Sequence, residues 1–150
     1  MGYKKFDVTT IEKIGFFEDK YSVTLPEDYK MFLLECNGCI VEEQDRKRVY
    51  VSGISDYIDV EVLFGIETGE KNCDIENWMD LFLDELLAKT LIIGNDIMQG
   101  LLLIINDEIN NGIYYWDDSY NFEMSCDEKN TYKICDTFEE FLALLTNVDL

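Results

Sequence analysis

The stretch LIIGNDIMQGLLLIINDEINNGIYYWDD, residues 91–118, decides the fold of this chain. It contains three apolar runs, at residues 91–93, 101–105 and 113–116. The break before the third run ends in Asn111-Gly112, a pair that tolerates positive φ and is typical of β-hairpins. The segment GNDIMQG, residues 94–100, is predicted to be a turn between the first two runs. We therefore expect three neighbouring strands, of which at least two form a hairpin.

The chain that follows this stretch is predicted to contain two more strands and a closing helix. The strands are expected at residues 120–126 and 131–135. Thr137 and Glu140 have the spacing of a capping box, so the helix is expected to begin there. Its apolar stripe is formed by Phe138, Phe141, Leu142 and Leu145.

The chain that precedes it begins with two predicted helices. The first covers about residues 10–20, with Thr9 as its cap and Glu12 completing a capping box. The second starts at Pro26, because proline suits the first helical position. It is expected to end near residues 37–38, with Asn37 or Gly38 in the left-handed position that closes many helices.

The middle of the chain changes from helical to alternating periodicity. Over residues 57–64 the apolar side chains alternate with Asp59 and Glu61, which predicts a half-buried strand with both carboxylates facing out. Residues 48–52 are expected to form a shorter partner strand. A further helix is predicted over about residues 75–88, with its acidic residues on the solvated side. Its core-facing stripe is formed by Ile75, Trp78, Met79, Phe82 and Leu86.

This order of elements predicts an α+β fold rather than a regular βαβ array. We expect one domain over residues 1–150, with a largely antiparallel, twisted sheet flanked by about four helices. A length of 150 residues suits a single domain. The 47% hydrophobic content, with nine Phe, nine Tyr and two Trp, argues against disorder.

The composition excludes several classes of function. The chain has 32 Asp and Glu, 12 Lys and Arg and no His, which gives a formal net charge of −20. His-based triads and His-based metal sites are therefore impossible. Nucleic acid and anionic membranes are disfavoured as partners, because both attract basic surfaces. The N-terminus MGYKKFDVTT has no apolar signal region and no run is long enough to span a bilayer, so a cytoplasmic location is expected.

The negative charge is concentrated after residue 50. Residues 1–50 carry 10 acids and 8 bases, whereas residues 51–100 and 101–150 each carry 11 acids and 2 bases. A field of one sign speeds encounter with cationic partners. The alternative interpretation is that the acidity serves only solubility.

Cys36 and Cys39 form a CxxC motif, for which a redox pair and half of a zinc site are the functional interpretations. The pair follows a predicted helix, so a thiolate there would lie at the negative end of the helix dipole. Cys73, Cys126 and Cys135 are scattered and supply no second half of a zinc site. We favour a simple helix end and expect neither a metal nor a cofactor.

Catalytic motifs are absent from the sequence. A window that begins at Asp107 places Gly112 as a calcium loop requires, but Ile109 occupies a ligand position and the template fails. No phosphate loop, dinucleotide fingerprint or nucleophile elbow is present. We therefore predict a binding protein and not an enzyme. An acid–base hydrolase is the alternative, supported only by the abundance of carboxylates.

Five strings, in this order, resemble the SUKH superfamily, also called Smi1/Knr4-like. They are LPEDYKMFLLECNG (25–38), VLFGI (62–66), LIIGNDIMQGLLLII (91–105), GIYYWDD (112–118) and TFEEFLALL (137–145). The resemblance spans about residues 11–145 and implies an α+β fold without enzymatic activity. The family pattern falls on positions that are mainly structural: Leu25, Pro26, Tyr29, Phe32, Asn37, Gly38, Gly94, Asn95, Gly100 and Trp116. The chain departs from the pattern at Cys39 and at residues 97–99.

The resemblance also implies a function. Bacterial members of this superfamily are mostly immunity proteins of polymorphic toxin systems that bind and neutralise a cognate toxin domain, often a nuclease. Fungal relatives are cytoplasmic regulatory binding proteins, which is the alternative role. A nuclease must be cationic where it grips phosphate, so we expect a basic toxin as the partner. The predicted contact surface is acidic and aromatic: Asp56, Asp59, Glu61, Asp96, Asp117, Asp118, Tyr120 and Glu123. Ordinary solvated surface is the alternative for each carboxylate.

Overall fold

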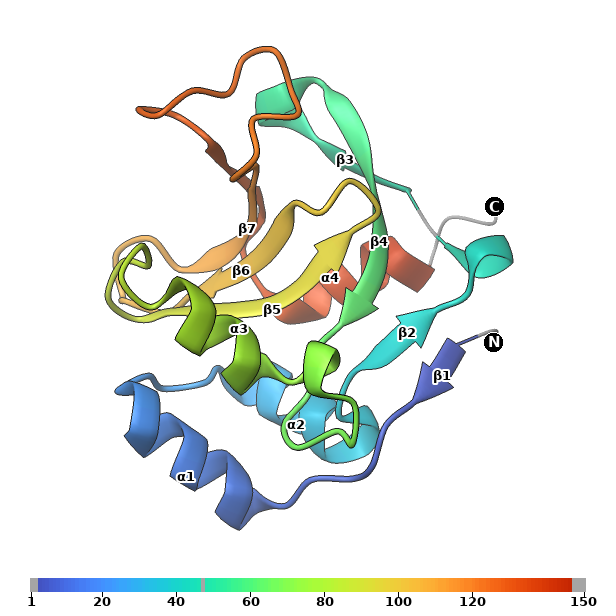
Figure 1. Cartoon of the computed structure of the whole chain (residues 1–150), viewed down its shortest axis with the longest axis vertical. Coiled ribbons are helices and arrows are strands. Elements are labelled where there is room, and N and C mark those ends of the chain that lie inside the picture. Colours follow the sequence, from blue (N-terminus) through green and yellow to red (C-terminus); the bar gives the residue numbers. More distant parts are fainter. Residues whose placement is uncertain (1–2, 47, 147–150) are drawn as a thin grey trace.

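A computed structural model describes residues 3–46 and 48–146 of the chain. This part forms four α-helices and eight strands (Figure 1). The helices are α1 (Ile11–Tyr21), α2 (Glu27–Cys36), α3 (Ile75–Phe82) and α4 (Phe138–Thr146). The strands are β1 (Tyr3–Lys5), β2 (Cys39–Val41), β3 (Arg48–Val51), β4 (Asp56–Leu63), β5 (Thr90–Asp96), β6 (Leu101–Ile105), β7 (Gly112–Trp116) and β8 (Thr131–Cys135). The predicted α+β class is confirmed.

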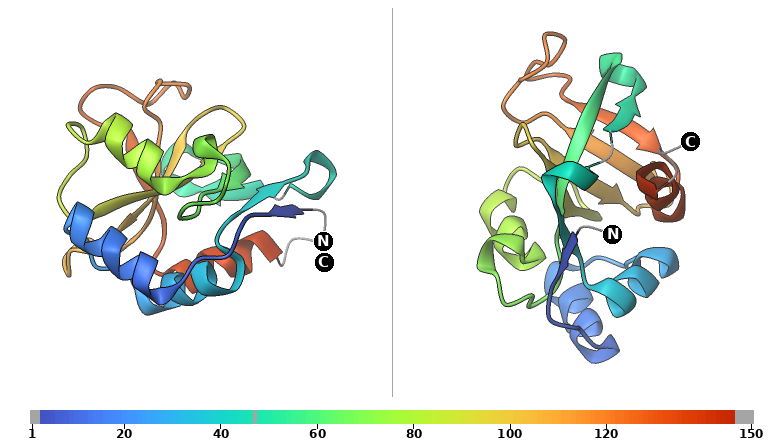
Figure 2. Two further views of the ribbon diagram at one scale, coloured as in Figure 1. Left: turned by 60° about the horizontal axis from the view of Figure 1, so that its bottom comes forward. Right: turned by 90° about the vertical axis from the view of Figure 1, so that its right-hand side faces the viewer.

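All the strands of this part belong to one antiparallel sheet. Its order is β1-β2-β4-β5-β6-β7-β8, and β3 pairs with β4 outside this path. The short turn η2 (Ser52–Ile54) follows β3 and contacts β8 at the far edge of the sheet. A Cβ atom on Gly53 would lie only 2.6 Å from the Tyr132 ring, so the two segments are in tight contact there. The sheet is therefore curled, and β3 bends back toward β8 (Figures 1 and 2).

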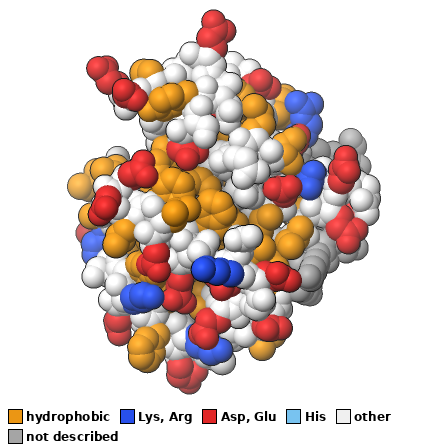
Figure 3. Space-filling model, in the orientation of Figure 1, with side chains coloured by type: hydrophobic (Ala, Val, Ile, Leu, Met, Phe, Trp, Pro, Cys, Tyr) orange, Lys and Arg blue, Asp and Glu red, His pale blue; other side chains and the backbone are white. Residues whose placement is uncertain are grey.

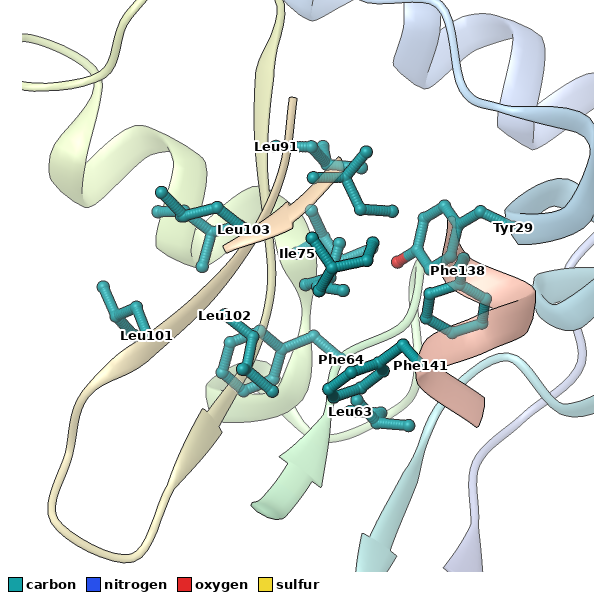
Figure 4. Packing of buried hydrophobic residues seen from close by; sticks show 14 of the residues in the cluster. Tyr29, Leu63, Phe64, Ile75, Leu91, Leu101, Leu102, Leu103, Phe138 and Phe141 are labelled. Atoms are coloured by element: carbon teal, nitrogen blue, oxygen red, sulfur yellow. The ribbon is translucent and has the colours of Figure 1, made fainter. Parts of the chain in front are cut away.

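The helices bury both faces of this sheet. Figure 2 shows α3 and α4 on opposite faces, while α1 and α2 lie together at one end. Tyr29 of α2 packs edge-on against Phe138 of α4, with ring centroids 4.8 Å apart. Leu63 and Phe141 extend this aromatic core toward the centre of the sheet (Figure 4). Such aromatic pairs stabilise a core by about 1 kcal/mol beyond their burial.

The ends of the helices are set by local hydrogen bonds. Thr10, not the predicted Thr9, caps α1 by accepting the N–H of Lys13 at 3.2 Å. The Thr137 hydroxyl accepts the Glu140 N–H at 3.1 Å, as expected of a cap. Asn37 ends α2 with φ 41°, which confirms the left-handed position expected there. Helix α3 ends at Phe82, earlier than predicted.

The strands differ from the prediction in length and number. Strand β5 continues through residues 94–96, which were expected in a turn, so only residues 97–100 connect it to β6. The hairpin between β6 and β7 is confirmed, but its connection spans residues 106–111 because the Asp107 carboxylate accepts the N–H groups of Ile109 and Asn110. The short strands β1 and β2 were not predicted.

Residues 120–126 do not form the strand that was predicted. They belong to an irregular loop over residues 117–130, which joins β7 to β8. Tyr120 has φ 54°, in the left-handed region that interrupts a strand. The N–H groups of Asn121 and Phe122 bond to a side chain, the Asp117 carboxylate, and so are unavailable to a sheet ladder. A local polar contact overrides the aromatic strand propensity here.

Candidate functional site

The carboxylates of β4 lie on the outer side of the strand, as predicted. Asp59 and Glu61 alternate with the buried Ile58 and Val60. Each carboxylate faces a cation of the same chain: Asp59 lies 3.7 Å from Arg48 and Glu61 lies 3.2 Å from Arg46. Part of the acidic charge on β4 is therefore neutralised internally. Asp56 is exposed at the start of the strand and accepts the Tyr57 N–H at 2.7 Å.

Asp117 is buried, and its carboxylate holds the loop of residues 117–130. One oxygen accepts the Asn121 N–H at 2.8 Å and the other accepts the Phe122 N–H at 2.9 Å. Its exposed fraction is 0%, so the prediction that it lies on the contact surface is corrected. The predicted contact residues that remain at this surface are Asp118, which is half-buried, and Tyr120 and Glu123, which are exposed.

Asp96 is also buried, at the end of β5, which corrects its predicted place on the contact surface. Its Oδ1 accepts the Gly100 N–H at 2.8 Å and the Tyr115 hydroxyl at 3.2 Å. Its Oδ2 has no hydrogen-bond partner in the described part of the chain. Desolvation raises the pKa of this carboxyl to about 6, although the hydrogen bonds from Gly100 and Tyr115 oppose the shift. The side chain therefore closes the β5–β6 turn and does not face a partner.

Asp96 and Asp117 act together because they hold two neighbouring loops. The Phe122 ring packs edge-on against Tyr115, the residue that binds Asp96. The Asn121 amide donates to the Met98 carbonyl at 2.8 Å and so fastens the loop of residues 117–130 to the β5–β6 turn. The same loop lies beside the β3–β4 tip (Figures 1 and 2). The exposed members of the predicted surface are thus brought to one end of the sheet.

A row of four aromatic rings, Phe64, Trp78, Phe82 and Trp116, was not recognised as a site from the sequence. Adjacent ring centroids in this row are 4.9, 6.3 and 5.3 Å apart. Trp78 and Phe82 lie on α3 and are half-buried, so they are accessible to solvent on one side. Their spacing identified them only as part of a core-facing stripe. We call these four residues the aromatic row.

The positions that carry the family resemblance are structural. Asn37 is buried; its amide donates to the carbonyls of Asp7 and Ile66 and accepts the Ile66 N–H. Gly38 has φ 86° and lies against the backbone of β4. A Cβ atom on Gly100 would lie 2.0 Å from the Tyr115 hydroxyl, so only glycine fits. The other positions contribute to packing in the same way: Leu25, Tyr29, Phe32, Gly94, Asn95 and Trp116.

The side chains of metal-ligating type are dispersed in the described residues. Within them no three Cys, Asp or Glu side chains converge as metal ligands. Cys39 is buried in strand β2, shortly beyond the end of α2 that carries Cys36. All five cysteines are thiols, without a disulfide bond. None of the helices in residues 3–46 and 48–146 has the length and apolar character needed to cross a bilayer.

Replacing Asp96 with asparagine is expected to raise the free energy of unfolding at pH 7.5 by about 2 kcal/mol. Because the folded pKa is raised, this carboxyl binds its proton more tightly in the folded than in the unfolded chain, and its contribution to stability is lost as the pH rises from about 4 to about 6. The asparagine side chain keeps one acceptor oxygen and carries no charge. Denaturant unfolding at pH 4.5 and 7.5 measures the difference from wild type.

Asp19→Asn, at an exposed position of α1, is the matched control for Asp96→Asn. It should leave the unfolding free energy unchanged at both pH values. If the Asp96→Asn difference from wild type were the same at pH 4.5 and pH 7.5, the ionisation of Asp96 would not be its cause.

Comparison with known proteins identifies one match. The model of the SMI1 / KNR4 family (SUKH-1) matches residues 9–144. This range agrees with the resemblance found over residues 11–145. No curated protein and no solved structure matches the chain.

Proposed function

The chain belongs to the SMI1 / KNR4 family (SUKH-1), and on that basis we propose that it is an immunity protein without enzymatic activity. It binds and neutralises a cognate toxin domain of a polymorphic toxin system. The toxin is cationic and of the nuclease type, and the complex forms in the cytoplasm. The observation that carries this proposal is the combination of family membership with a net charge of −20.

The surface at the end of the sheet has the properties that this function needs. Asp56, Asp118 and Glu123 present carboxylates from two neighbouring segments, the β3–β4 tip and the loop of residues 117–130. A nuclease binds phosphate through Lys and Arg, so carboxylates compete for the same side chains. The long-range negative field accelerates capture, which favours an inhibitor that must act before the toxin cleaves its substrate.

The loop of residues 117–130 is fixed before any partner arrives. Buried Asp117 anchors its start, and Asn121 fastens it to the β5–β6 turn. A surface that is already ordered loses less conformational entropy on binding and therefore binds more tightly. The buried carboxylates thus support the binding function indirectly, although they do not reach the surface.

The proposal predicts tight, salt-sensitive binding to the C-terminal domain encoded by the gene immediately upstream. The dissociation constant should rise about tenfold between low and moderately high salt, because screening weakens long-range attraction between opposite charges. Isothermal titration at about 50 and about 300 mM NaCl, which brackets physiological ionic strength, measures it. Co-expression should also rescue growth of cells that carry the upstream domain.

The variant Asp118→Lys/Glu123→Lys should weaken this binding more than Glu35→Lys, which reverses an exposed charge on α2. Tight binding that does not change with salt concentration would be consistent with the immunity role. It would contradict the proposal that the acidic surface attracts a cationic toxin. Failure of the upstream domain to bind would favour the alternative role, a cytoplasmic regulatory binding module without a toxin partner.

A further inference from the structure

The exposed side of the aromatic row continues onto the surface of α3. Leu81 follows Trp78 by three residues, so the two side chains are neighbours on the helix surface. Leu81 is 67% exposed, an unusual exposure for a leucine within a helix. The side of α3 next to α1 is different, because Asp80 there accepts a 2.7 Å hydrogen bond from Tyr21. Figure 3 shows hydrophobic side chains gathered in the centre of this view, between α3 and the loop of residues 117–130.

Two carboxylates from separate elements lie at one end of the row. Phe82 and Trp116 form its last ring pair, and Glu85 and Asp118 follow them in the sequence. Desolvation raises the pKa of Asp118, and the charges of Asp117 and Glu85 raise it further. Neither Glu85 nor Asp118 forms an ion pair with a described residue, and Asp118 Oδ1 is a buried acceptor without a hydrogen bond there.

We propose that this surface is the docking site for the partner protein, and that the partner inserts an apolar or aromatic side chain flanked by Lys or Arg. We call it the α3 face. Its accessible members are Trp78, Leu81, Phe82, Glu85 and Asp118, and the buried Trp116 supports it by packing against Phe82. This inference rests on the proposed function and deepens it, because it names the centre of the interface and the chemistry of the segment that binds there.

The chemistry of the α3 face selects this occupant. Half-exposed aromatic rings held by their neighbours are good anchors, because they bury apolar area without losing much freedom. The unpaired carboxylates require a cation, since a neutral apolar partner would leave them desolvated beside each other. A second copy of this chain is disfavoured because it would bring the same two carboxylates to the interface. The acidic surface of the 117–130 loop then steers the partner, and the α3 face holds it.

The two tryptophans of the chain allow this site to be observed directly. Trp78 and Trp116 are the only tryptophans in the sequence; Trp78 belongs to the α3 face and Trp116 supports it. In ¹⁵N–¹H spectra of the full chain, the two indole N–H signals therefore report on this surface and on what supports it, since the Trp78 indole donates to the Asn72 carbonyl at 2.8 Å and Trp116 is buried against Phe82. Addition of the upstream C-terminal domain should shift both signals.

A matched pair of double variants tests whether the contact carries affinity. Leu81→Ser/Glu85→Lys changes exposed positions four residues apart on the α3 face, and Met31→Ser/Glu35→Lys makes the same kinds of change at exposed positions of α2. The first should weaken binding of the upstream domain at least about tenfold, and the second less than about twofold. Unchanged melting temperatures would show that both variants fold.

Synthetic peptides test whether the α3 face is a docking site independently of whether the protein is an immunity protein. KRLFKR should shift the indole signals, whereas KRSSKR, which lacks the apolar pair, and EELFEE, which reverses the charge, should not. If the upstream domain binds without shifting either indole signal, and the two double variants bind it equally, the α3 face is wrong and the immunity role stands. If the upstream domain does not bind, the proposed toxin partner is wrong, and the peptide series alone supports or overturns the α3 face.

Discussion

Asn37→Asp is expected to lower the free energy of unfolding by about 4 kcal/mol, because it leaves a buried and a partly buried carbonyl without their donor and places a charge beside them. The Asn37 amide donates to the Asp7 carbonyl at 2.6 Å and to the Ile66 carbonyl at 2.9 Å. Its oxygen accepts the Ile66 N–H at 2.8 Å, and the side chain is 1% exposed. An ionised carboxylate keeps the last bond only and brings a negative charge to two carbonyl oxygens. Chemical denaturation at pH 8 measures the loss.

The destabilisation by Asn37→Asp should be smaller at pH 5 than at pH 8. Burial raises the pKa of an aspartate, so stability falls as the pH rises and the proton is lost. Protonation restores one O–H donor. Asn72→Asp, at an exposed position that precedes α3, should change stability by less than about 0.5 kcal/mol at either pH.

The variant Asn37→Gly distinguishes the contribution of the side-chain hydrogen bonds to stability from that of the backbone conformation. Glycine adopts the left-handed φ of 41° more easily than asparagine, but it cannot make the three side-chain bonds. A clear loss of stability in this variant would assign the effect to the amide group. A neutral or stabilising result would contradict our account and leave only the backbone conformation.

The fold was predictable where the signals are local. Thr137 caps α4 through contacts within one turn, and the left-handed end of α2 at Asn37 depends on the intrinsic preference of a few residues. Strands β1 and β2 have three residues each, too few to show a period. In β5, residues 94–96 have turn propensities, but pairing with β4 and β6 keeps them extended. Tertiary contacts, which no window of sequence contains, decide such cases.

The acidic character of the candidate site could be predicted from the composition, but which carboxylates reach the surface could not. Acidic residues are usually exposed, which led to the prediction that Asp96 and Asp117 face a partner. Both are buried, and nearby N–H and O–H groups donate to their carboxylates. A stripe position such as Phe82 is apolar whether its ring is fully or partly covered, so periodicity could not reveal that Trp78 and Phe82 are partly accessible. That exposure is set by tertiary packing, which no window of sequence contains.

Asp117→Ala is expected to cost about 3 kcal/mol of stability and to release the loop that carries Tyr120 and Glu123. The carboxylate accepts two backbone N–H groups, and hydrogen bonds to a charged acceptor contribute about 1.5–3 kcal/mol each. Asp117→Asn retains one acceptor oxygen, so it should lose about half as much. Denaturant unfolding of the two variants and wild type measures this order.

Hydrogen exchange tests whether the loss at Asp117 is local to the loop. In wild type the amides of Asn121 and Phe122 should be protected, because both donate to the buried carboxylate. In Asp117→Ala they should exchange as fast as unprotected amides, while β6 amides remain protected. Asp127→Ala, which removes the exposed partner of the Tyr120 hydroxyl, should leave both amides protected. Persistent protection of Asn121 and Phe122 in Asp117→Ala would mean that packing of Phe122 on Tyr115, not the carboxylate, orders the loop. With the loop released, binding of the upstream domain should also weaken, because the acidic surface must then be ordered by the partner.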